Sequence, residues 1–111
     1  MLSINIFVTQ LVRGRSIMDN DLNDLRESLD NIDNALIFLL AERFRVTQRI
    51  GIYKSEHGLP AVDEVREKIQ FARIERLARD CRLNPEFAVK MLRLIIDEVI
   101  ENHEAIRGER S

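Results

Sequence analysis

The sequence predicts an all-α protein with three helices per chain, the first of them long enough to be shared between two chains. Three observations support this fold class. Glycine and proline account for only 4 and 2 of the 111 residues, too few for the turns of a β-rich fold. Aromatic residues make up 5% and tryptophan is absent, which favours a leucine-rich helical interior. Apolar residues recur every three or four positions over most of the chain.

The first helix is predicted to begin at Asn20 or Asp21, either of which can cap it, and to run to about His57. Gly58 and Pro60 then end it. One stripe of this helix consists of Leu22, Leu25, Leu29, Ile32, Leu36, Leu39, Arg43, Val46, Ile50 and Tyr53.

The length of this helix predicts the assembly. At 1.5 Å per residue it spans about 54 Å, nearly twice the diameter of a small domain. Two shorter helices cannot cover so long an apolar stripe, so we expect an intertwined homodimer in which the long helices pack together. The alternative is a break between Thr47 and Gly51, which would give a monomeric four-helix bundle.

The second helix is predicted from near Asp63 to about Asp80. The third opens with Asn84 as its cap and Pro85 at its first position. These helices complete one domain over residues 21–107, and we expect residues 108–111 to form a frayed tail. Residues 1–20 are interpreted as a flexible N-terminal extension, within which Met18 could be the physiological start.

Composition excludes several classes of function. The formal net charge of -2 gives no basic excess for binding nucleic acid or an acidic membrane surface. No stretch approaches the ~18 apolar residues of a membrane span. Cys81 is the only cysteine, so an intrachain disulfide and a cysteine-rich zinc site are excluded. We therefore expect a cytoplasmic protein without a metal or cofactor.

Arg43 occupies a stripe position where a leucine is expected. A guanidinium cannot lose its charge, and burying it unpaired costs several kcal/mol. We therefore expect an anion to meet Arg43 in the interior. Lys54 follows eleven residues later, close to three helical turns, and so shares that face. Its alternative role is that of a helix-terminal lysine whose ammonium stays in water.

Two acids and an imidazole are further candidates. Asp63 and Glu67 lie one turn apart at the start of the second helix, with Arg66 on the same side. They are either helix-start acids or acceptors for a ligand hydroxyl. His103 continues the stripe of Leu92, Ile95 and Val99. It either contacts a ligand or is a core or interface residue whose ring nitrogens are hydrogen-bonded within the protein. His57 lies on another element, so a histidine metal site is not expected.

Arg26 flanks the stripe of the first helix, about 25 Å along the axis from Arg43. It cannot serve the same site within one chain, but it could reach the partner's site in an antiparallel dimer. The alternative is an exposed ion pair with Asp30, one turn further on. With no nucleophile–base pair and no glycine-rich phosphate loop, the inward charges predict a site that holds and polarises a small polyanion.

Six segments together resemble the all-helical (type II) chorismate mutases. They are Leu-Arg-Glu (25–27), Ile-Asp (32–33), Leu-Leu-Ala-Glu-Arg (39–43), Ile-Gly-Ile-Tyr-Lys (50–54), Pro-Ala-Val-Asp-Glu-Val-Arg-Glu (60–67) and Ile-Ile-Asp-Glu-Val (95–99). The resemblance covers residues 21–106. It implies an intertwined homodimer and the Claisen rearrangement of chorismate to prephenate in the shikimate pathway of aromatic amino acid biosynthesis, with no cofactor.

The resemblance also implies roles for the cations. Arg43 would hold one carboxylate of chorismate, and Arg26 would enter from the partner chain to hold the other. Lys54 would touch a carboxylate and the ether oxygen.

The same resemblance assigns the substrate hydroxyl to Glu67 and the Asp63 region, with Arg66 supporting the acids. Two positions depart from the family pattern: His103 stands where a glutamine often donates to the ether oxygen, and Val99 stands where a serine is often found. Two alternatives remain open, an isochorismate pyruvate lyase with nearly the same pocket and a non-catalytic helical dimerisation module.

Overall fold

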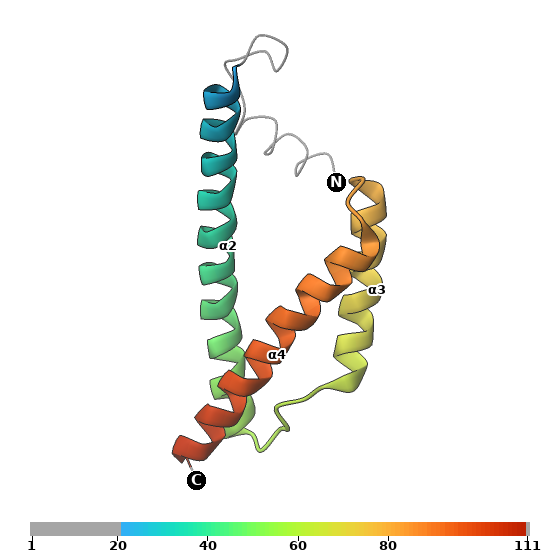
Figure 1. Ribbon diagram of the computed structural model, residues 1–111. Coiled ribbons are helices and arrows are strands. Elements are labelled where there is room, and N and C mark those ends of the chain that lie inside the picture. The colour runs from blue at the N-terminus through green and yellow to red at the C-terminus, as the bar shows by residue number, and fades with distance from the viewer. Residues whose placement is uncertain (1–20, 111) are drawn as a thin grey trace. The chain divides into compact units, whose positions relative to one another are not determined.

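The computed structural model describes residues 21–110, with side chains described as far as Gly108. Three α-helices follow one another in this range, α2 (Leu22–Glu56), α3 (Glu64–Asp80) and α4 (Pro85–Arg110), and residues 21–110 contain no strand (Figure 1). The predicted all-α class with three helices is therefore confirmed. The expected N-terminal extension, including Met18, lies outside the described residues.

Helix α2 is continuous over 35 residues, about 53 Å at the standard rise, so the alternative of a break between Thr47 and Gly51 is wrong. Asp21 caps its start by accepting a bond of 2.9 Å from the Asp24 amide. At its other end Gly58 has a φ of +64°, and the Leu59 amide donates to the Lys54 carbonyl at 2.8 Å. This is the Schellman geometry that glycine permits.

Local chemistry also sets the bounds of the other two helices. Asp63 caps α3 by accepting from the Arg66 amide at 3.0 Å. Asn84 caps α4 by accepting from the Glu86 amide at 2.9 Å. Both caps were predicted from the sequence. Helix α4 continues to Arg110, beyond Gly108, where the tail was expected to begin.

The chain divides into two compact units at Arg43. The second unit, residues 43–111, contains the end of α2 together with α3 and α4, which pack on each other. Its buried apolar side chains are Ala61, Ala78, Ala88, Leu92, Ile96 and Ile106, and His103 is buried among them at 3% exposure. The core is therefore small and contains an imidazole.

The apolar stripe of α2 remains largely exposed in the single chain. Leu39, Ile50 and Tyr53 are 59%, 45% and 56% exposed, although the sequence pattern places them on an inner face. A large apolar surface left open in this way is typical of an interaction site. None of the described helices is long and apolar enough to cross a membrane.

Candidate active site

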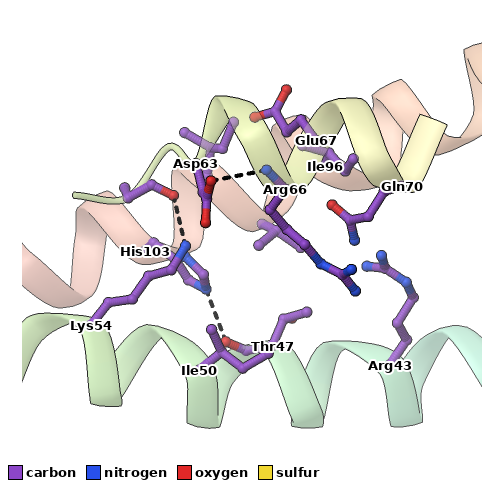
Figure 2. Close-up of a pocket in the computed structure, with 13 residues that line it drawn as sticks. Arg43, Thr47, Ile50, Lys54, Asp63, Arg66, Glu67, Gln70, Ile96 and His103 are labelled. Carbon is purple, nitrogen blue, oxygen red and sulfur yellow. Dashed lines mark hydrogen bonds between the residues drawn. The ribbon is translucent and has the colours of Figure 1, made fainter. Parts of the chain in front are cut away.

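The second unit contains a cavity of about 130 Å³ that is partly open to solvent. The end of α2, the start of α3 and the second half of α4 surround it (Figure 2). The predicted site residues that line it are Arg43, Lys54, Asp63, Arg66, Glu67, Val99 and His103. The structure therefore brings together side chains from three helices, as far as 60 residues apart in sequence.

Arg43 is half-buried in this cavity. Its Nη1 is shielded from solvent and has no hydrogen-bond partner within residues 21–110. Burial, reinforced by the positive charges of Arg66 and Arg73, lowers the pKa of Arg43 below its ordinary value. Figure 2 shows the guanidinium groups of Arg43 and Arg66 extending toward each other. Two cations that face each other in this way can bind an anion between them.

Lys54 is half-buried and contributes a third cation to the cavity. Its Nζ donates to the carbonyl oxygen of Ala61 at 3.2 Å, which holds the ammonium against the chain between α2 and α3. An ammonium carries three donors, so two remain for a ligand. Sequence reasoning missed Ala61, because a backbone carbonyl carries no signature in the residue type.

The two candidate acids differ in their surroundings. Asp63 uses Oδ1 to cap α3. Glu67 accepts from the Arg93 Nη1 at 3.1 Å through Oε1, and its side chain is 16% exposed. The second oxygen of each carboxylate is thus available to a ligand that donates a hydrogen bond.

Arg93 is a site neighbour that the sequence reasoning missed. Besides Glu67 it contacts Asp97 at 3.4 Å, and its guanidinium lies 4.5 Å from the ring centroid of Phe71. The spacing of Arg93 and Asp97 by four residues was the one signal available in the sequence. These contacts hold the Glu67 carboxylate from α4.

His103 lies on α4 against the C-terminal part of α2. Its Nε2 is 2.9 Å from the carbonyl oxygen of Thr47, and its Nδ1 is buried with no hydrogen-bond partner among the described residues. The approach is close because Gly51 has no side chain: a Cβ there would lie 2.5 Å from Cδ2 of His103. Sequence reasoning considered Gly51 as part of a possible helix break and did not predict its contact with His103.

The remaining predicted residues are placed as follows. Val99 lines the cavity and is half-buried. Arg26 is exposed on the part of α2 that belongs to the first unit, and it is not among the lining residues. Cys81 is the C-cap of α3 and a free thiol. In residues 21–110 no three His, Cys, Asp or Glu side chains are grouped so that they could hold a metal ion.

Comparison with known proteins shows which family the chain matches. Residues 25–104 match the family model of the type II chorismate mutases. The chain belongs to this family. The predictions of a chorismate mutase and of an isomerase are thereby confirmed, and the two alternatives, the lyase and the module without activity, are not favoured.

Individual relatives agree with this assignment. The chain is 29% identical over 80 residues to a chorismate mutase of Methanocaldococcus jannaschii, covering 72% of this chain and 81% of that protein. It is 32% identical over 92 residues to a 4-amino-4-deoxychorismate mutase of Streptomyces venezuelae, covering 83% of this chain and 89% of that protein. A bifunctional chorismate mutase/prephenate dehydratase of Buchnera aphidicola is 32% identical over 81 residues, which span 73% of this chain and 21% of that protein.

Proposed function

We propose that the cavity binds chorismate and converts it to prephenate by a Claisen rearrangement, in which the ether C–O bond breaks as a C–C bond forms. The observation that carries this proposal is Arg43, whose half-buried guanidinium faces Arg66 and has an Nη1 with no partner in residues 21–110. A substrate with two carboxylates supplies the anion that this pair of cations lacks.

The cations divide the anionic groups of the substrate between them. Arg43 and Arg66 bind one carboxylate, and this is a more direct role for Arg66 than support of the acids. Lys54 binds a carboxylate and approaches the ether oxygen, where negative charge develops. His103 contributes the second donor to that oxygen. Removing one such donor typically costs about 2.7–4 kcal/mol in related oxyanion sites.

Glu67 and Asp63 accept from the ring hydroxyl of the substrate. Arg93 occupies Oε1 of Glu67, so Oε2 is the oxygen that faces the hydroxyl. The relative named a 4-amino-4-deoxychorismate mutase suggests an amino group as the alternative ring substituent. We favour the hydroxyl, because an ammonium would add positive charge to a cavity whose three cationic side chains already outnumber its two carboxylates.

Binding also supplies much of the catalysis. The reaction is unimolecular and needs neither a nucleophile nor a proton transfer, so the enzyme must hold a flexible substrate in its folded, reactive conformer. Orientation of this kind can provide about 7–11 kcal/mol in favourable cases. Val99 and Ile96 supply the apolar wall against which the ring packs.

We further propose that the active protein is an intertwined homodimer. The exposed stripe of α2, with Leu39 and Tyr53 each more than half exposed, supports a partner helix along it. In this dimer Arg26 enters the partner's cavity and binds the second carboxylate. We place the enzyme in the cytoplasm, which suits the free thiol of Cys81, and in aromatic amino acid biosynthesis.

The activity is tested with purified protein and chorismate. We expect chorismate to be consumed, seen as loss of its ultraviolet absorbance, and an isomer of unchanged mass to form. With 4-amino-4-deoxychorismate we expect a lower kcat/KM. Release of pyruvate from isochorismate with no turnover of chorismate would identify a lyase instead, and no turnover of any of the three would contradict the proposal.

Sharing of the site between chains is tested by mixing two inactive variants, Arg26→Ala and Arg43→Ala. Each variant alone has a defect in both sites of its dimer. A mixed dimer has one site with both arginines intact, so unfolding and refolding an equal mixture should restore up to roughly a quarter of the wild-type activity by random pairing. Failure to regain activity, with dimers formed, would mean that Arg26 does not serve the partner's site.

A further inference from the structure

We propose that His103 acts on the substrate only as an imidazolium, donating from Nδ1 to the ether oxygen. This inference rests on the proposed function of the cavity. It follows from which ring nitrogen has no hydrogen-bond partner among the described residues, and it assigns Gly51 as the residue that positions the ring.

Nε2 of His103 lies 2.9 Å from the carbonyl oxygen of Thr47, and a carbonyl oxygen can only accept a hydrogen bond. Nε2 must therefore carry a proton. In a neutral imidazole only one nitrogen is protonated, so Nδ1 then carries a lone pair. The neutral ring consequently presents an acceptor, and not a donor, at Nδ1.

The imidazole ring of His103 is held in one orientation. Gly51 provides the notch on α2 in which the imidazole edge lies, since an added Cβ would be 2.5 Å from Cδ2 and 2.9 Å from Nε2 of His103. The ring is 3% exposed. Turning it over would place carbon against the Thr47 carbonyl and lose the bond, so the packing and the hydrogen bond select the same orientation.

Nδ1 of His103 is buried and meets no hydrogen-bond partner in the part of the chain that the structure describes. The charged groups that share the cavity with His103 come from α2 and from the start of α3, while α4 contributes apolar neighbours. These groups are Lys54 and Arg43 on α2, and Asp63, Arg66 and Glu67 at the start of α3.

Whether Nδ1 carries a lone pair or a proton affects the stability of the transition state. A lone pair on Nδ1 would repel the ether oxygen as that oxygen gains negative charge, whereas an N–H at Nδ1 would stabilise it. A bound dicarboxylate adds two negative charges to a cavity in which cations outnumber carboxylates. Histidine is the side chain that ordinarily changes charge between pH 5 and 8. The reaction should therefore slow as the pH rises.

The kinetic test compares the wild type with His103→Gln, whose amide donates at every pH. We expect the wild-type kcat/KM to fall about tenfold per pH unit on its alkaline side, and at least about tenfold between pH 6 and pH 9. The profile of His103→Gln should be flat. An active wild type with a flat profile, or the same alkaline fall in both proteins, would overturn the inference alone. Inactivity at every pH would overturn the proposed function, and this inference with it.

A second readout does not depend on turnover. The chain has two histidines, so ¹⁵N spectra of a His57→Asn variant report His103 alone. At pH 9 the free protein should carry its ring proton on Nε2. At the pH of highest activity, a complex with a bicyclic transition-state mimic should carry protons on both nitrogens. A proton on Nδ1 alone in the free protein, or a neutral ring in that complex, would contradict the inference.

Discussion

Replacement of Gly51 by alanine adds one methyl group where α2 packs against His103 and Ile106 of α4. The new Cβ would lie 2.5 Å from Cδ2 of His103 and 2.9 Å from Cδ1 of Ile106. The isoleucine terminus can rotate away, but the imidazole is rigid. Carbon atoms pack at about 3.5 Å or more, so the ring must retreat by about 1 Å. That movement would lengthen the 2.9 Å contact with Thr47 beyond hydrogen-bond range.

The change in the free energy of unfolding on Gly51→Ala is the sum of opposing contributions. Overpacking costs about 1–3 kcal/mol and the lost hydrogen bond about 0.5–1.5 kcal/mol. Alanine recovers about 1 kcal/mol of helix propensity over glycine. We therefore expect the free energy of unfolding of Gly51→Ala, measured by urea titration of the helical circular dichroism, to fall by about 0.5–3.5 kcal/mol. Because a displacement of 1 Å can cost 10²-fold in rate, kcat should fall by about ten- to a hundredfold.

Gly108 offers a matched control on α4. Apart from its chain neighbours and the backbone of its own helix, a Cβ at Gly108 would meet no atom of the described residues within 4 Å. Gly108→Ala should therefore gain up to about 1 kcal/mol of stability and keep the wild-type rate. If Gly51→Ala matched the wild type in stability and rate, or if both substitutions were equally harmful, Gly51 would not be the residue that positions His103.

Two further substitutions separate binding from stability. Arg43→Met should lower kcat/KM at least about a hundredfold, because it removes the cation that holds the substrate carboxylate. It should not lower the urea midpoint, because this half-buried cation faces the positive charge of Arg66. A large loss of stability would indicate that Arg43 is a structural residue. Arg93→Gln should raise the KM for chorismate several-fold with a smaller change in kcat, because it frees the Glu67 carboxylate, and should change stability by no more than about 0.5 kcal/mol. Arg79→Gln, which breaks an exposed ion pair elsewhere on α3, serves as its control, and an equal effect on KM in both would contradict a role for Arg93.

Local chemistry explains why much of the fold could be predicted from the sequence. Asp63 and Asn84 accept bonds from amides two or three residues away, so their capping roles follow from residue type and spacing alone. Arg43 could be recognised because a cation interrupts an otherwise apolar stripe. The periodicity of α2 likewise placed Lys54 on the same face, and both residues line the cavity.

Contacts between distant segments could not be predicted. Arg93 meets Glu67 across 26 residues, and pattern alone does not determine which surface charges pair. Thr47 acts through its carbonyl oxygen, which every residue possesses. The sequence showed an imidazole at position 103 but not which nitrogen it presents, because that depends on the notch at Gly51.

A crystal structure with a bicyclic dicarboxylate mimic of the transition state would show which groups the substrate meets. We expect a carboxylate of the mimic to accept a hydrogen bond from Nη1 of Arg43, and the ether oxygen to lie within hydrogen-bond distance of Nδ1 of His103. A mimic bound away from Arg43, or an acidic side chain of the protein occupying that guanidinium in the complex, would contradict this expectation.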